Sequence, residues 1–139
     1  PTQFHQGTDA LTSSAMPYWE RVRDHPPLEN RVSIRLYAEV ADVYEVTDLD
    51  HLLPLKGHHI LADETVEQRF YYRQPGLFVI VARIHRSPTP FDVTETPAMA
   101  GCKSWVELPA ELPTETLTPV LGEEEFADFR LQIRRKLGL

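Results

Sequence analysis

Cysteine is almost absent from the sequence, and glycine is scarce. The 139 residues include one cysteine, Cys102, and six glycines, against twelve prolines. A lone cysteine excludes an intrachain disulfide and any metal site built from several cysteines. The few glycines are scattered, and no glycine-rich phosphate-binding loop is present.

Long hydrophobic runs are also missing. No apolar stretch approaches the roughly 20 residues that a membrane helix needs. No basic region followed by an apolar one opens the chain as a signal peptide would. We therefore expect a cytoplasmic protein without a membrane partner.

Positive charge is in short supply. There are 14 Lys and Arg residues against 21 Asp and Glu residues, a formal net charge of -7. This balance argues against a protein that adheres non-specifically to nucleic acid, because sequence-independent phosphate binding depends on positive charge. Residues 56–86 and 129–139 are nevertheless locally basic, so a local basic groove is compatible with the composition.

The length and the 42% of apolar residues suit one compact core. We predict a single domain over residues 1–139. Residues 31–46 alternate apolar and polar side chains, which predicts a half-buried strand with a bulge at Ala41–Asp42. Residues 77–84 are apolar on both faces and predict a central strand, ended by Pro88 and Pro90, with a short edge strand over residues 91–93 after them.

Further elements follow from spacing and end signals. We expect a helix after Pro17, a helix over residues 64–71 capped by Asp63, and a short edge strand over residues 104–108. The final segment, from Glu123, has acidic residues at its start and basic ones at its end, as a helix favours. Its apolar stripe is formed by Phe126, Phe129, Ile133 and Leu137.

Several strands with two or three helices, and no regular βαβ alternation, indicate an α+β fold. We expect a curled mixed β-sheet or a small β-barrel, with a C-terminal helix.

Histidines are numerous, and three of them lie near carboxylates. His51, His58 and His59 precede Asp63 and Glu67, so a hydrolytic metal site is conceivable. Adjacent histidines on an extended segment point to opposite sides, however, and the spacing fits neither a His-Glu-x-x-His motif nor a deaminase motif. We favour surface or loop-packing histidines, and predict no metal and no cofactor. Near Cys102 and Ser104 a tight turn is favoured over a nucleophile.

Arginines are interleaved with aromatic residues in two places. Arg35 and Tyr37 share a strand face, and Arg69 is followed closely by Tyr72. Arginine clamps phosphate and aromatic rings stack on bases, so a groove lined by both side chains could hold nucleic acid. Packing of such aromatic residues in the core is the alternative interpretation.

Five strings of the sequence carry a resemblance to a known family. They are residues 1–6 (PTQFHQ), 34–40 (IRLYAEV), 58–60 (HHI), 66–70 (VEQRF) and 101–108 (GCKSWVEL). Together they resemble a bacterial family of unknown function in the eighteen-hundred series of such domains, over nearly the whole chain. That family usually has a further segment before the first string, so the resemblance implies that strands completing the fold are missing here.

The resemblance also bears on partners and fold. Family members occur beside Mrr-type restriction endonuclease domains, which implies a role near DNA restriction or modification. The order of elements is similar to the PUA-like barrels, including the ASCH and EVE modules, which surround a pocket for a nucleobase or nucleotide. Residues 35–46, 63–71, 77–85 and 101–108 would take the corresponding places.

The leading hypothesis is a PUA-like module that recognises nucleic acid or a modified base and lends specificity to a restriction endonuclease or RNA-processing partner. Its candidate contact residues are Arg35, Tyr37, His58, His59, Arg69, Tyr72 and Trp105. The arginines would contact phosphate, the aromatic residues would stack, and a histidine would read a polar base edge. The alternative is a metal-dependent hydrolase or nuclease acting on nucleotides. A third hypothesis is an oligomerisation domain that associates through spare positions of the last helix, such as Leu131.

Overall fold

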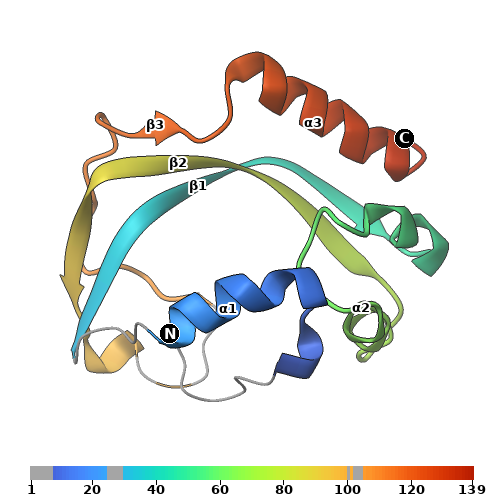
Figure 1. The fold of residues 1–139 in the computed structure, drawn as a ribbon, viewed down its shortest axis with the longest axis horizontal. Helices are drawn as coiled ribbons and strands as arrows, with labels where there is room; N and C mark the ends of the chain where they lie inside the picture. The colour runs from blue at the N-terminus through green and yellow to red at the C-terminus, as the bar shows by residue number, and fades with distance from the viewer. Residues whose placement is uncertain (1–7, 25–29, 100, 102–104) are drawn as a thin grey trace.

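The computed structural model describes residues 8–24, 30–99, 101 and 105–139. The helices are α1 (Met16–Arg23), α2 (Asp63–Phe70) and α3 (Glu123–Lys136), and the strands are β1 (Arg31–Val46), β2 (Leu77–Thr94) and β3 (Thr118–Pro119). Short 3-10 turns lie between them, including η3 (Leu49–His51) and η4 (Leu53–Leu55). The two long strands form an arch, with α3 and α1 on opposite sides of it (Figure 1). The predicted α+β fold with a curled sheet and a C-terminal helix is confirmed.

Within the described residues the sheet is antiparallel, in the order β1-β2-β3. Pairing of β1 with β2 runs from Arg31 opposite Thr94 to Val46 opposite Leu77. The register shifts between Val40 and Asp42, which confirms the bulge predicted from the slip in apolar phase. A bulge increases the local twist, and this accounts for part of the curvature of the arch.

Pro88 and Pro90 do not end β2, contrary to the prediction. The strand continues to Thr94, and a second register shift lets Arg86 pair with Leu36 and Phe91 pair with Ile34. Four residues of β2 therefore face a single residue of β1. Proline lacks a backbone donor but is tolerated at such irregularities, where the ladder does not need its N–H group.

The predicted edge strand over residues 104–108 is wrong for the part that the structure describes. Residues 105–108 belong to no strand and are exposed, and residue 104 lies outside the described residues. The third strand is instead β3, which pairs Thr118 and Pro119 with Arg86 and His85. A two-residue strand that includes proline has no alternation by which the sequence could reveal it.

The core occupies one face of the sheet. Helix α3 covers this face with the predicted stripe, and Phe126, Ile133 and Leu137 are buried while Phe129 is half-buried. The turns after β1 and the end of α2 contribute further buried residues to the core. The buried cluster consists of Val46, Leu52, Leu55, Phe70, Val81, Phe126, Ile133 and Leu137.

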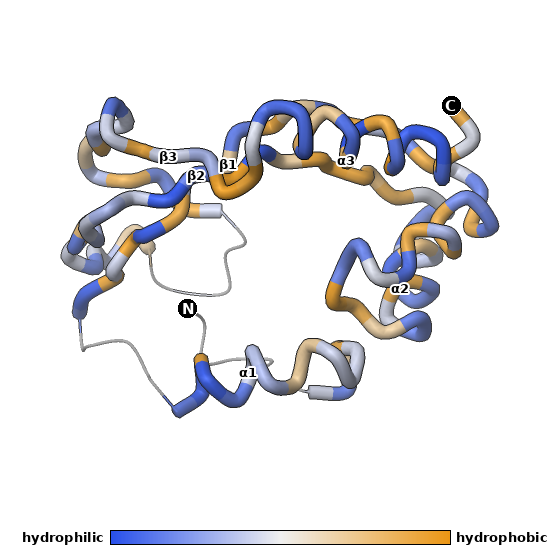
Figure 2. The backbone as a smooth tube through the Cα atoms, turned by 45° about the horizontal axis from the view of Figure 1, so that its top comes forward, coloured by the Kyte–Doolittle hydropathy of each residue, from blue (hydrophilic) through white to orange (hydrophobic). Residues whose placement is uncertain are grey.

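The opposite face of the arch is apolar but open among the described residues. Val43 pairs with Ile80, and because paired residues share a face, their side chains emerge together, away from α3. Phe78, two residues along, is 65% exposed and Ile80 is 52% exposed. Figure 2 shows hydrophobic residues following the two long strands. The predicted central strand over residues 77–84 is confirmed, because β2 is the middle strand, but only one of its two apolar faces is covered by α3.

The described helices do not include one that is both long enough and apolar enough to span a membrane. Helix α1 includes the predicted proline in its first turn, and residues 25–29, expected to end it, lie outside the described part of the chain.

Candidate functional site

A cavity of about 400 Å³ lies along β2, between α3 and the segment that joins η4 to α2. This size falls in the roughly 300–1,000 Å³ range of small-ligand sites. Its walls are mostly apolar, with two histidines among them. The lining residues are Leu52, Leu55, His58, His59, Leu61, Val66, Leu77, Phe78, Val79, Ile80, Val81, Ala82, Phe129 and Ile133.

One wall of the cavity is an unpaired strand edge. The carbonyl of Ile84 accepts a hydrogen bond from the Val120 backbone N–H, so the even-numbered residues of β2 point their backbone groups away from β1. By the same alternation, Phe78, Ile80 and Ala82 direct N–H and C=O groups toward this edge. β3 pairs only with His85 and Arg86, and no backbone bond to these three residues is made on this side by the rest of the described chain. The edge thus offers a row of alternating donors and acceptors.

Both predicted histidines line this cavity. They follow a turn at Gly57, whose φ of 87° suits glycine, and the His58 N–H donates to the Leu55 carbonyl. The expectation that adjacent histidines point apart assumed an extended segment, whereas residues 56–59 form a turn and bend. The chain before α1 holds this segment in place, because Thr12 N–H donates to the Ile60 carbonyl and Ala62 N–H to the Ala10 carbonyl.

The two histidines have different surroundings. The His58 ring lies 5.7 Å from the ring of Phe129, at an interplanar angle of 57°. The Nδ1 atom of half-buried His59 is inaccessible to solvent and lacks a hydrogen-bond partner among the described residues. Buried polar atoms are nearly always hydrogen-bonded in folded proteins, so this atom is an exception within the described chain.

Arg69 belongs to α2, Tyr72 follows the end of that helix, and neither residue lines the cavity. Val66 lines the cavity, and Arg69 is three residues further along the same helix, which places it one turn away. Arg69 is exposed and forms no ion pair within the described chain. Tyr72 is also exposed, with the Arg73 guanidinium 5.2 Å from its ring centroid.

The remaining predicted residues lie elsewhere. Tyr37 pairs with His85, and their rings meet edge to face at 5.9 Å, beside the strand residues that hold β3. Arg35 precedes it on β1 and is exposed. β3 and α2 lie toward opposite ends of the arch, as Figures 1 and 2 both show. Trp105 is 87% exposed in an irregular segment.

The single groove expected from the sequence is therefore divided. The structure brings together His58, His59 and the helix of Arg69, and places Arg35 and Tyr37 on the first half of β1.

Sequence reasoning missed Phe129 as a cavity residue and the ion pairs that hold α3 over the sheet. Arg83 bonds Glu123 at 2.7 Å, and this hydrogen bond holds the pKa of Glu123 below its usual value. Arg130 donates two hydrogen bonds of 2.7 Å to Asp42, which lower the pKa of that carboxyl. The unbroken apolar stripe of α3 was the only available sign that Phe129 would face inward.

The carboxylates near the histidines do not complete a metal site. Asp63 forms an ion pair with Lys56, which raises the pKa of the lysine. Asp63 is also the first residue of α2 instead of its cap, and makes no capping hydrogen bond. Across the described part of the chain, no three His, Cys, Asp or Glu side chains gather as metal ligands would. The hydrolase alternative thus has no supporting geometry there, and Cys102 lies outside the described residues.

Comparison with known proteins identifies a family. A family model described as "Domain of unknown function (DUF1802)" matches residues 1–132. Neither the curated proteins nor the solved structures include a match. The similarity to PUA-like barrels and the neighbouring endonuclease domain therefore stay predictions.

Proposed function

The chain belongs to DUF1802, a family without an assigned function, and on that premise we propose that the protein is a recognition module for nucleic acid that takes one unpaired base into the cavity beside β2. The observation that carries the proposal is the combination of an apolar cavity, an unpaired strand edge and two histidines. The family membership confirms the resemblance seen in the sequence, and the function rests on the geometry.

The chemistry of the cavity matches that of a nucleobase. A base has two flat apolar faces and an edge of alternating hydrogen-bond donors and acceptors. Apolar side chains such as Leu55, Val66 and Ile133 suit the faces, while the N–H and C=O groups of Ile80 suit the edge. A base inside a duplex already uses its pairing edge, so this site favours a single-stranded or flipped base.

The histidines take complementary roles in this proposal. The rings of His58 and Phe129 offer surfaces on which a base can stack. In the proposal the His59 ring turns when a base binds, and its Nδ1 atom, buried in the free protein, then supplies one further donor or acceptor for the base edge. An orphaned buried atom gains a full hydrogen bond when a ligand supplies its partner, so it contributes to affinity and to selectivity.

Phosphate contacts come from the neighbouring basic residues. In the proposal Arg69, exposed on α2, binds the phosphate of the bound nucleotide, and exposed Tyr72 stacks on the next base. Arg35, Tyr37 and Trp105 would contact nucleotides further along a longer strand. In this proposal the module lends its base specificity to an endonuclease or RNA-processing partner, and a modified base is one ligand that it would distinguish.

The test is a binding titration with short fluorescent oligonucleotides. We expect the protein to bind single-stranded DNA or RNA more tightly than the matching duplex. We expect His59→Ala to weaken binding about fivefold or more, the cost of one buried hydrogen bond. We expect Arg69→Ala to weaken it while keeping the fold.

The matched control is His51→Ala, because His51 is exposed and does not line the cavity. Thermal melts show whether each variant is folded. Equal binding to single strands and duplex, no binding at all, or an equal effect of His51→Ala and His59→Ala would each contradict the proposal. Cleavage in the same samples, dependent on added metal, would favour the hydrolase alternative.

A further inference from the structure

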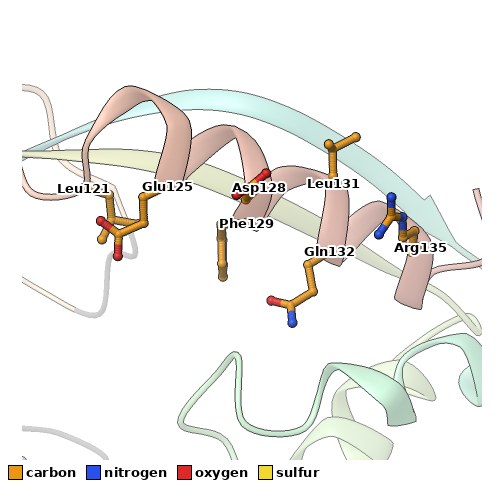
Figure 3. Close-up of a pocket in the computed structure, with 7 residues that line it drawn as sticks. All are labelled: Leu121, Glu125, Asp128, Phe129, Leu131, Gln132 and Arg135. Carbon is orange, nitrogen blue, oxygen red and sulfur yellow. The ribbon is translucent and has the colours of Figure 1, made fainter.

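The outward side of α3 has an organised pattern of its own. Phe126, Ile133 and Leu137 face the sheet, and side chains turned away from the sheet form a stripe that lines a shallow hollow together with Leu121 and Phe129. We call this the outer stripe. It consists of Glu125, Asp128, Leu131, Gln132 and Arg135, which are among the residues drawn in Figure 3.

The charges of α3 are sorted along its length. The first half contains Glu123, Glu124, Glu125 and Asp128, and the second half contains Arg130, Arg134, Arg135 and Lys136. Compensation of the helix dipole accounts for such an order at the two ends. Dipole compensation does not explain why some of these charged side chains form ion pairs and others do not.

Charges that face the body of the protein are used by the fold. Glu123 pairs with Arg83, Arg130 pairs with Asp42, and Lys136 donates to the Pro54 carbonyl. The charges of the outer stripe are not used in this way. Glu125, Asp128 and Arg135 form no ion pair among the described residues.

The outer stripe also contains an exposed apolar side chain. Leu131 is 51% exposed, between the acidic and the basic residues of the stripe. Single exposed leucines are common on protein surfaces. Here the leucine lies at the centre of a stripe whose two ends have opposite charges, and this arrangement is complementary to itself.

We infer that the outer stripe is the contact surface of a homodimer, in which α3 packs antiparallel to α3 of a second copy. A two-fold axis beside residue 130 places Glu125 opposite Arg135 of the second copy, and Asp128 opposite its Gln132. Both pairs have residue 130 as their midpoint, so one axis satisfies both, and each pair occurs twice. The two copies of Leu131 meet near the axis. A parallel arrangement would oppose like charges and is disfavoured.

The expected dimer is weak and sensitive to salt. One helix on each side buries less than the roughly 1,200 Å² of a standard stable interface. Its exposed ion pairs are screened as salt rises. Phe129 lines both the hollow and the cavity, so the second copy would lie beside the proposed base site. The inference does not depend on the proposed function, because it rests on α3 alone.

Sedimentation equilibrium over a wide range of protein concentration, with charge-reversal variants, tests the proposed homodimer. We expect reversible dimers at low salt that dissociate at high salt. Glu125→Arg and Arg135→Glu each create two like-charge contacts, so each should raise the dissociation constant about tenfold or more. The double variant restores opposite charges with the order reversed and should recover most of the affinity.

The matched control is Arg134→Glu, which makes the same charge change in the same turn but points about 100° away around the helix. It should still dimerise, and thermal melts check that each variant is folded. A wild-type protein that stays monomeric at low salt, a double variant that does not recover, or a control that dissociates equally would overturn the inference. Base binding by Glu125→Arg gives a separate readout, which we expect to be retained.

Discussion

At the scale of single residues, two ion pairs set the position of α3. Arg130 donates two hydrogen bonds to Asp42 of β1, and Glu123 forms an ion pair with Arg83 of β2. The Asp42 and Arg130 positions are separated by 88 residues in the chain, so no local pattern could have paired them. These contacts also determine which side of the helix remains outside.

Asp42→Asn tests the first of these pairs. The hydrogen bond from Arg130 holds the pKa of Asp42 below its ordinary value of 3.8. Because the folded pKa is the lower one, the stabilisation is fully present above about 3.8 and is lost as the pH falls through the folded value. We expect the substitution to lower the melting temperature by roughly 2–4 °C at neutral pH.

The difference in melting temperature between the wild-type protein and Asp42→Asn should shrink toward zero in strong acid. Thermal melts followed by circular dichroism measure it. Asp92→Asn is the control, because Asp92 is an exposed residue of β2 without an ion pair in the described chain. A difference in melting temperature that does not change with pH would argue against the pairing.

At the scale of elements, periodic segments were predictable and irregular ones were not. The alternation in β1 and the stripe of α3 depend on neighbouring residues, and both predictions are confirmed. The predicted end of β2 at Pro88 is wrong, because both prolines lie in an irregular stretch of β2 where four residues face a single residue of β1. β3 was not predicted, since it depends on contact with His85 and Arg86.

The two faces of α3 should respond differently to truncation. Ile133 is 3% exposed, so Ile133→Ala should reduce the free energy of unfolding by about 2–5 kcal/mol. Leu131→Ala, two residues earlier on the outer side, should change it by about 0.5 kcal/mol or less in dilute protein. Urea unfolding measures both, and equal losses would mean that α3 does not face the sheet as described.

At the scale of the whole molecule, net charge and local shape favour different kinds of contact. An acidic protein with a charge of -7 repels a polyphosphate chain, whereas the cavity beside β2 is mostly apolar. The proposed interface therefore gains its affinity from one base and few phosphates. Such an interface should lose little affinity when salt is added.

A salt titration of oligonucleotide binding measures this balance. Each phosphate contact on a single strand contributes a slope of roughly -0.7 to the plot of log affinity against log salt. With Arg69 and at most one further arginine in contact, we expect a total slope between about -0.7 and -1.5. A much steeper slope would show that many phosphates are bound, contrary to recognition through a single base.

The candidate site was predictable only in part. The sequence singled out His58, His59, Arg69 and Tyr72 as chemically capable residues, and the structure places the two histidines in one cavity and Arg69 on the helix that contributes Val66 to it. The sequence did not indicate Phe129 or the edge of β2, because both join the site only when segments that are distant in the chain meet. Arg35, Tyr37 and Trp105 belong to other parts of the molecule.

By itself the sequence determined the α+β class, the two long strands, the bulge in β1, the terminal helix and the family. These follow from periodicity, local end signals and matching strings, all of which act between neighbouring residues. Only the tertiary structure decided which sheet face α3 covers, where β3 pairs, and which strand edge remains open beside the histidines. Those features depend on contacts between residues far apart in the chain, and such contacts cannot be predicted from the pattern of neighbouring residues.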